Sequence, residues 1–169
     1  MHTDVAGEAD TFVLVAMVAD QRVALPLRDV VEILPAMALV PLPKGPDVVR
    51  GVVNLRGNPL PVLDLRARLD LPERAPCADD HVVVCRVGAR AVGVWVDHAS
   101  EVGSLDADRL VLAGDLPHAE HLLGAAMVAD GLLLVHDVRT FLDADEALQL
   151  DQALADHDLA EHGRGGLDA

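Results

Sequence analysis

The chain has 169 residues and a formal net charge of −15, with 28 acidic side chains against 13 Lys and Arg. A surface this acidic repels the phosphates of nucleic acids and the headgroups of anionic lipids, so neither is expected as a binding partner. The length suits one domain or two small joined ones, and no apolar run is long enough for insertion into a membrane.

Half of the residues are apolar and very few are aromatic, so we expect a core built from Val, Leu and Ala. The β-branched side chain of Val favours strands. Residues 1–10 are small and polar and are predicted to be disordered. Residues 12–19 and 22–27 predict a hairpin, and residues 30–34 predict a short extended segment that leads into a proline-rich loop.

Residues 51–56 and 60–65 predict the next two strands, and residues 66–69 predict one helical turn. The connection 71–80 is rich in Pro, Ala and Asp. Such a composition is typical of a loop, and we interpret this segment as the boundary between two halves of the chain.

The second half repeats this organisation, with short strands predicted at 81–87, 91–96, 101–105, 122–128 and 132–135. The last two strands form a hairpin, because an Asp-Gly pair suited to a two-residue turn lies between them. Residues 107–121 are expected to be mostly irregular, and residues 137–142 to form a helical turn. Leucines spaced among acidic residues predict an amphipathic helix at 143–159, followed by a frayed tail at 162–169.

These segments amount to about nine or ten short strands in two groups of similar size, divided near 71–80. An open sheet would expose its edge strands, and closing each group into a small barrel removes those edges. No helix of the length that parallel β-α-β units need lies between the strands. The sequence therefore predicts a mostly β protein of two small barrels, with short helical segments and a C-terminal helix.

The first residues lack the basic and apolar regions of a signal peptide. The two cysteines, Cys77 and Cys85, form no disulfide framework. We therefore expect a reducing, cytoplasmic compartment.

Catalysis finds no specific support in the sequence. His118 and His121 have Glu120 between them, but zinc needs three or four ligands held together by a rigid element, and none is predicted there. No serine lies in a nucleophile motif, and no glycine-rich phosphate loop follows a strand. We expect solvated histidines, no metal, no cofactor and no enzymatic activity.

The stretch 49–65, VRGVVNLRGNPLPVLDL, is the most distinctive part of the chain. Asn54 and Arg56 are expected on one face of its first strand. A guanidinium on an apolar strand needs a partner, and Asp64 and Glu32 are the candidates for an ion pair. Alternatively Arg56 is presented at the rim of a groove to another protein, since Arg is common at binding hot spots. The two roles are compatible.

These residues resemble the CheW-like adaptors of bacterial chemotaxis and the homologous regulatory domain of their histidine kinases. The similarity runs in order along about three quarters of the chain, through the motifs ALPL, VVEIL, GVVNLRG, PVLDLR, VGVWVD and LLGAAMVADGLLLVHD. It implies two five-stranded SH3-like β-barrels packed side by side. Residues 11–142 then form the CheW-like domain, with its divide near 71–80, and residues 143–169 form an acidic C-terminal helix and tail.

The resemblance also implies a function. Members of the family are adaptors without enzymatic activity or cofactor, and they bridge chemoreceptors to a CheA-type histidine kinase. The helical hairpin at the cytoplasmic tip of the receptor lies in the groove between the barrels, and the regulatory domain of the kinase packs end-on against the adaptor. A cytoplasmic protein recruited to membrane-associated receptor arrays is therefore expected.

Carried over by position, the partner-binding residues of this chain are Val30, Glu32, Ile33, Gly51, Asn54, Arg56, Gly57, Val82 and Val102. For each valine the alternative is a place in the core, and for the glycines the alternative is a requirement of backbone geometry alone. The groove itself is expected to have a floor of Val, Ile and Leu and a rim that carries the opposite charges of Glu32 and Arg56.

Three other functions stay open at this point. The first is a CheW-like adaptor in another receptor–kinase pathway, such as surface motility or gene regulation. The second is a small metal-dependent enzyme that uses His118 and His121. The third is an isolated regulatory fragment of a kinase. The chain has no phosphotransfer or nucleotide-binding segment of its own, so it could only be a fragment of such a protein.

Overall fold

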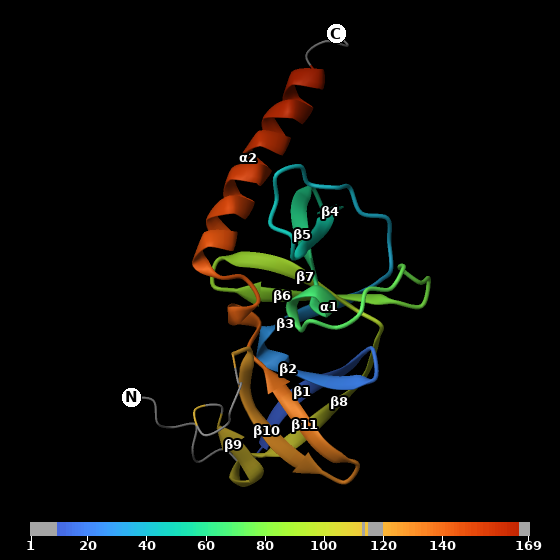
Figure 1. Ribbon diagram of the computed structural model, residues 1–169, viewed down its shortest axis with the longest axis vertical. Coiled ribbons are helices and arrows are strands. Elements are labelled where there is room, and N and C mark those ends of the chain that lie inside the picture. Colours follow the sequence, from blue (N-terminus) through green and yellow to red (C-terminus); the bar gives the residue numbers. More distant parts are fainter. Residues whose placement is uncertain (1–9, 113, 115–119, 166–169) are drawn as a thin grey trace.

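The computed structural model describes residues 10–112, 114 and 120–165, and its strands form two sheets stacked along the long axis of the molecule (Figure 1). The six-stranded sheet has the order β8-β1-β2-β11-β10-β9, and the five-stranded sheet the order β3-β6-β7-β5-β4. The predicted mostly β fold with short helices and a C-terminal helix is confirmed. The predicted disorder of residues 1–10 falls almost entirely outside the described residues.

The strands of the six-stranded sheet are β1 (Asp10–Val18), β2 (Gln21–Pro26), β8 (His98–Asp106), β9 (Leu110–Leu112), β10 (Leu122–Val128) and β11 (Gly131–His136). The strands of the five-stranded sheet are β3 (Val30–Pro35), β4 (Val49–Leu55), β5 (Asn58–Asp64), β6 (His81–Val87) and β7 (Arg90–Val96). The helices are η2 (Leu27–Asp29), α1 (Leu65–Arg68), η3 (Ala107–Arg109), η5 (Val138–Thr140) and α2 (Ala144–Gly165).

The two sheets do not divide the chain near 71–80, so the expected split of the strands was wrong. The first hairpin, β1 and β2, joins strands from the end of the chain, and β3 to β7 form the other sheet together. The parallel pairing of β2 with β11 joins the first hairpin to the last strands, and the parallel pairing of β5 with β7 joins the β4–β5 hairpin to the β6–β7 hairpin. Such pairings link segments far apart in sequence, so local patterns do not reveal them.

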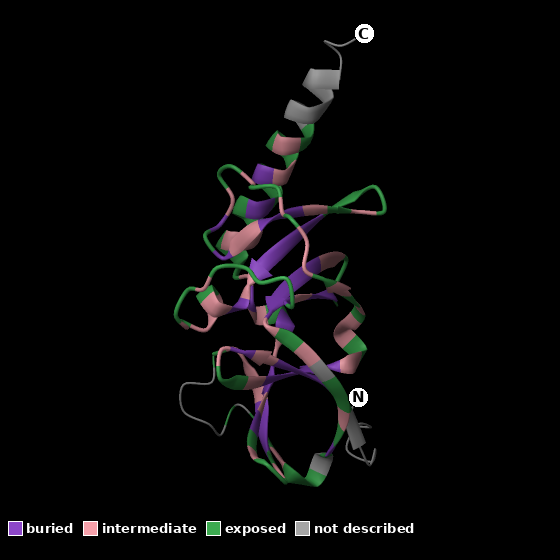
Figure 2. Cartoon of the chain, turned by 90° about the vertical axis from the view of Figure 1, so that its right-hand side faces the viewer, coloured by how far each residue is buried: buried purple, intermediate pink, exposed green. Residues whose placement is uncertain are grey.

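Three apolar clusters explain why many strands are apolar on both faces. One cluster lies within the six-stranded sheet and includes Val13 and Val15 of β1, and a second lies within the five-stranded sheet around Trp95. The largest cluster joins the sheets and contains the alternate residues of the same strands, such as Leu14 and Ala16. Buried residues accordingly run through the strands of both sheets (Figure 2). Strands buried on both faces lose the alternation of apolar and polar residues.

The segment after β3 is attached to β4, because Val40 and Val52 exchange backbone hydrogen bonds of 2.9 and 2.8 Å. Since β3 and β4 are the two edge strands of this sheet, the bridge brings the chain from one edge to the other. The six-stranded sheet gains the short strand β9 from the segment 107–121, which was expected to be irregular.

The connection 71–80 is fixed to the core by Asp80. This carboxylate is 2% exposed and accepts hydrogen bonds from the Trp95 indole N–H at 3.0 Å, the Cys77 backbone N–H at 2.8 Å and Arg74 at 2.7 Å. Burial alone would raise the pKa of Asp80, but these donors outweigh it and lower the pKa below its ordinary value. The segment interpreted as a boundary is therefore attached to the interior of a barrel.

A second carboxylate, Asp97, ties the two sheets together. It accepts hydrogen bonds from Arg66 at 2.6 Å and Arg74 at 2.8 Å, and from the backbone N–H of Ala19, in the turn between β1 and β2, at 2.8 Å. Burial would raise the pKa of Asp97, and the arginines lower it below its ordinary value on balance. Asp97 thus links the Arg66 and Arg74 side chains to the turn of the first hairpin.

Helix α2 lies against the five-stranded sheet and extends past the ends of β4 and β5 (Figure 1). It begins with a capping box in which Asp143 and Glu146 each accept the other's backbone N–H, at 2.7 and 3.0 Å. It continues through Gly163 to Gly165, beyond the predicted end at 159, and no glycine or proline lies between Ala144 and His162. No described helix is long and apolar enough to cross a membrane.

Candidate partner-binding surface

Strand β3 presents apolar side chains to solvent and is an edge of the five-stranded sheet, where it pairs with β6 alone among the described strands. Val31 is 53% exposed and Ile33 is 42% exposed, while Val30 and Leu34 point inward. A bulge between Val30 and Glu32 shifts the register against β6. The placement of Ile33 at the surface fits the expectation, but Val30 packs against the core between the sheets, and Val31, which sequence reasoning missed, is the exposed valine.

Glu32 of β3 and Arg56, which follows β4, form a bidentate ion pair. Arg56 donates from its two terminal nitrogens to the carboxylate oxygens of Glu32, at 2.7 and 2.9 Å. The hydrogen bonds from Arg56 lower the pKa of Glu32 below its ordinary value. Of the two predicted partners, Glu32 is therefore the correct one, and Asp64 lies near Arg50 instead. The guanidinium side chain of Arg56 remains 69% exposed.

Arg56 was expected on the strand, but it lies in the turn between β4 and β5. The turn gives Arg56 a φ of 50° and Gly57 a φ of 87°, a backbone conformation that favours glycine. The Asn54 side chain accepts the Gly57 backbone N–H at 2.8 Å and so closes the turn. Asn54 and Gly57 are exposed, and they hold Arg56 out from the surface.

Gly51 and Val82 were predicted to bind a partner, and the structure buries both. A Cβ on Gly51 would lie 2.8 Å from the carbonyl oxygen of Val40 and 2.9 Å from Cβ of Leu39, so the glycine permits the close approach of this segment. Val82 has no exposed surface and packs beside Trp95 within the barrel. Gly51 has no side chain and Val82 is fully buried, so the structure favours the alternatives of backbone geometry for Gly51 and a core position for Val82. Their part in partner binding stays a prediction.

Val102 lies on β8, the edge of the six-stranded sheet, and is exposed as predicted. Val102 pairs with Leu14, and Phe12 pairs with Ser104, so Phe12 and Val102 are diagonal neighbours on one face. Phe12 is also exposed. Phe12 and Val102 therefore form a second apolar patch. It lies on the same face of the sheet as Leu14, which is buried between the two sheets.

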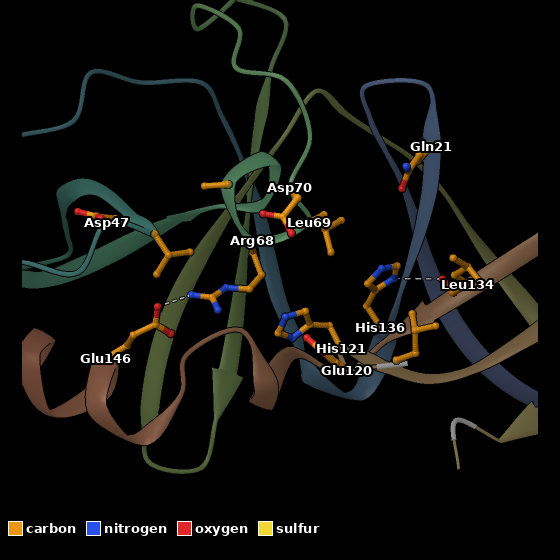
Figure 3. Close-up of a pocket in the computed structure, with 13 residues that line it drawn as sticks. Gln21, Asp47, Arg68, Leu69, Asp70, Glu120, His121, Leu134, His136 and Glu146 are labelled. Carbon is orange, nitrogen blue, oxygen red and sulfur yellow. Dashed lines mark hydrogen bonds and ion pairs between the residues drawn. The ribbon is translucent and has the colours of Figure 1, made fainter. Parts of the chain in front are cut away.

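The junction of the sheets also forms a cleft of about 600 Å³, shown in Figure 3. Polar and apolar side chains line it in similar measure, and they come from the six-stranded sheet, the segment before β4, α1 and α2. Arg68 is paired to Glu146 on one side, and His121, His136 and Glu120 lie on the other. None of the predicted partner-binding residues lines it. The groove with a floor of Val, Ile and Leu that the sequence predicted is not this cleft.

The metal hypothesis finds no ligand set in the described part of the chain. His118 lies outside the described residues, and the Nδ1 atom of His121 is 3.0 Å from the Thr140 hydroxyl. His136 is buried beside Phe141, and burial lowers its pKa to about 4. Among residues 10–112, 114 and 120–165, no three His, Cys, Asp or Glu side chains gather in a way that could hold a metal ion.

Comparison with known proteins decides the family. Residues 13–146 match the CheW-like domain, which is well over half of the chain. The chain belongs to the CheW-like family. Members of this family are scaffolds without catalytic activity that couple receptors to CheA in chemotaxis, and this protein is accordingly a non-catalytic coupling adaptor.

Individual relatives agree with the CheW-like assignment. The chain is 30% identical to "Chemotaxis protein CheW" of Klebsiella aerogenes over 115 residues, which cover 66% of this chain and 69% of that protein. It is 34% identical to "Protein FrzA" of Myxococcus xanthus over 115 residues, which cover 66% of this chain and 71% of FrzA.

A solved structure confirms the fold. The crystal structure of the scaffolding protein TtCheW from Thermoanaerobacter tengcongensis superposes with a TM-score of 0.74 and 21% identity. The match covers 80% of this chain and 94% of TtCheW. The CheW-like arrangement of two SH3-like barrels is therefore the architecture of this protein.

Proposed function

We propose that this CheW-like protein couples the cytoplasmic tip of a chemoreceptor to the regulatory domain of a CheA-type histidine kinase, within membrane-associated receptor arrays. The observation that carries the proposal is the exposed Arg56–Glu32 pair beside the exposed apolar residues Val31 and Ile33 of β3. An apolar patch next to a bidentate charged pair is the composition of a binding hot spot.

Each exposed feature has a part in this coupling. Val31 and Ile33 on β3, together with Val102 on β8 and its neighbour Phe12 on β1, offer apolar side chains to a partner helix. Arg56 and Glu32 fix the orientation of that partner, because charges at a rim discriminate between correct and incorrect docking. Several modest contacts then suffice, since arrays hold linked partners at high effective concentration.

The test is the substitution Arg56→Glu. It replaces an exposed cation by a carboxylate that faces Glu32, and we expect it to abolish binding to the receptor, the kinase or both in a pulldown. The matched control is Arg109→Glu, because the Arg109 side chain is 73% exposed and pairs with Asp106 at the other sheet. Normal binding by a folded Arg56→Glu variant, or equal losses in both variants, contradicts the proposed surface.

A CheW-like adaptor in a receptor–kinase pathway other than chemotaxis is the second candidate. The chain matches "Protein FrzA", whose name does not mention chemotaxis, over as many residues as the Klebsiella CheW, so these two matches support both candidates equally. Co-purification of the tagged protein from its native cell identifies the kinase and receptor and separates the two candidates.

A further inference from the structure

A nearly buried histidine lines the cleft at the junction of the sheets (Figure 3). His136, the last residue of β11, is only 3% exposed, and its Nδ1 atom lies 3.3 Å from the backbone carbonyl oxygen of Leu134. A carbonyl oxygen can only accept, so Nδ1 carries the proton and Nε2 is left with a lone pair. Nε2 makes no hydrogen bond with a described residue and is not sealed from solvent. His136 therefore brings an unused hydrogen-bond acceptor to the cleft.

His121 lies close to His136 and has the same arrangement. Its Nδ1 atom is 3.0 Å from the Thr140 hydroxyl, and that hydroxyl donates its own proton to the Asp137 carbonyl at 2.7 Å. The hydroxyl oxygen must then accept from Nδ1, which leaves Nε2 of the neutral ring as an acceptor. Burial lowers the pKa of His136 to about 4, so that ring is neutral near pH 7. The cleft thus offers imidazole acceptors and suits a ligand that donates.

The charged side chains of the lining are one arginine and four carboxylates. Arg68 and Glu146 pair with each other, so their charges cancel, and the remaining Nε atom of Arg68 is buried. The other three acids form no hydrogen bond or ion pair with another described residue through their side chains, and all three are exposed. These cleft carboxylates are Asp47, Asp70 and Glu120, and they lie apart from one another around the cleft (Figure 3). The lining therefore carries an unbalanced negative charge that is spread over several positions.

Size and apolar surface favour a small organic ligand over a metal ion. The cleft of about 600 Å³ falls within the range of about 300–1,000 Å³ that small-molecule sites span. No three potential metal ligands gather in the described part of the chain. Apolar side chains lie among the carboxylates and histidines of the lining: Val48, Ala67, Leu69, Leu122 and Leu134. A fitting ligand therefore combines several N–H donors and positive charges with hydrocarbon segments between them.

We infer that this cleft binds an aliphatic polyamine, whose ammonium groups meet the cleft carboxylates and donate to His136, and whose methylene segments lie against the apolar lining. Several ammonium groups balance all the cleft carboxylates, whereas the single ammonium group of a lysine from another protein balances only one. The ligand bridges the six-stranded sheet to the segments that flank β4 and β5, because the lining comes from both. Neither Arg56 nor Glu32 lines the cleft, so this inference is independent of the proposed function.

The first test neutralises single cleft carboxylates in the full chain, with spermidine as the probe in isothermal titration calorimetry. Asp70→Asn suits the backbone, since Asp70 has a φ of 56° that asparagine tolerates, and Glu120→Gln keeps the shape of the side chain. We expect each variant to weaken spermidine binding about threefold at low salt, and less at high salt. The control is Glu101→Gln, at an exposed carboxylate of β8 outside the cleft, which should bind as the unmodified protein does. Equal losses in all three variants would show that spermidine responds only to the net charge of −15, and would overturn the inference.

The second test separates hydrogen bonding from charge. Spermidine with all its nitrogen atoms permethylated keeps the positive charges but has no N–H donor. We expect it to bind about fivefold more weakly than spermidine, because the histidine acceptors then stay unused, and His136→Leu should reduce that difference. Equal binding of the two probes to the unmodified protein, or no saturable binding of spermidine, overturns the inference. Saturable binding of zinc in place of spermidine also overturns it and identifies a metal site instead.

Discussion

Asp80 and Glu32 are carboxylates that accept hydrogen bonds from an arginine, and they lie on neighbouring segments of the same barrel. Asp80 is buried and is bonded by the indole of Trp95 and a backbone N–H as well as by Arg74. Glu32 is bonded by an arginine that is mostly exposed. The same pairing of charges thus occurs once inside the barrel and once at its rim.

Because one carboxylate is buried and the other belongs to an exposed ion pair, we expect the first to matter for the stability of the fold and the second for partner binding. A buried carboxylate stabilises the fold only while all its donors are present, because each unpaired group costs desolvation energy. An exposed pair contributes little to stability and leaves its charges available to a partner. Buried polar groups of this protein are therefore expected to matter for unfolding, and the rim pair for association.

The largest effect is expected from Asp80→Ala. It leaves the Trp95 indole and the Cys77 backbone N–H without their acceptor, and we expect the free energy of unfolding to fall by about 3 kcal/mol in a urea titration. Asp130→Ala is the control, because that carboxylate is exposed and pairs with Arg22 at 3.4 Å. Similar stabilities for the two variants contradict the structural role of Asp80.

His136 supplies a buried group that can be titrated. Burial lowers its pKa to about 4 from 6.5, so the folded protein holds it neutral while the unfolded chain takes up a proton below pH 6.5. Its stabilising contribution is complete above pH 6.5 and is lost as the pH falls to about 4, a loss of about 3 kcal/mol.

We expect His136→Leu to flatten the dependence of stability on pH between 6.5 and 4, measured by urea unfolding across that range. His98→Ala, at an exposed histidine, is expected to retain the dependence. An unchanged pH profile in His136→Leu contradicts the prediction.

The two glycines of the GVVNLRG motif extend the comparison to uncharged positions. Gly51→Ala forces Cβ against the Val40 carbonyl and Leu39, and we expect a loss of about 1–3 kcal/mol in the free energy of unfolding. Gly57→Ala meets no atom within 4 Å but must adopt a positive φ, at about 1 kcal/mol. Gly103→Ala, with open space and no such φ, is the control, and thermal unfolding ranks the three.

The smallest effect on stability is expected when the rim pair is exchanged. The double variant Glu32→Arg, Arg56→Glu keeps opposite charges at the same two positions, so thermal unfolding should change little. Partner binding should nevertheless be lost, because the partner then meets the charges in reverse order. A large drop in stability would place this pair with Asp80 as a structural element.

Sequence patterns predicted most strands and the Asp-Gly hairpin, because alternation and turn chemistry are local properties. They also identified Glu32 as one of two possible partners of Arg56. Val82 and Val30 came instead from positions carried over from the family resemblance. The sequence could not correct Val82, because β6 is apolar on both faces and such a strand does not reveal which face is exposed. It could not replace Val30 by Val31, because a bulge that shifts the register leaves no clear signal in the sequence.

By itself, the sequence determined the β-rich composition, the family and the adaptor class, since composition and short motifs can be recognised without knowing which distant segments pack together. Only the tertiary structure decided how the first hairpin joins the last strands, which valines face solvent, and that α2 lies beside the β4–β5 turn. These features arise from contacts between segments far apart in sequence, and such contacts depend on how the apolar faces pack together.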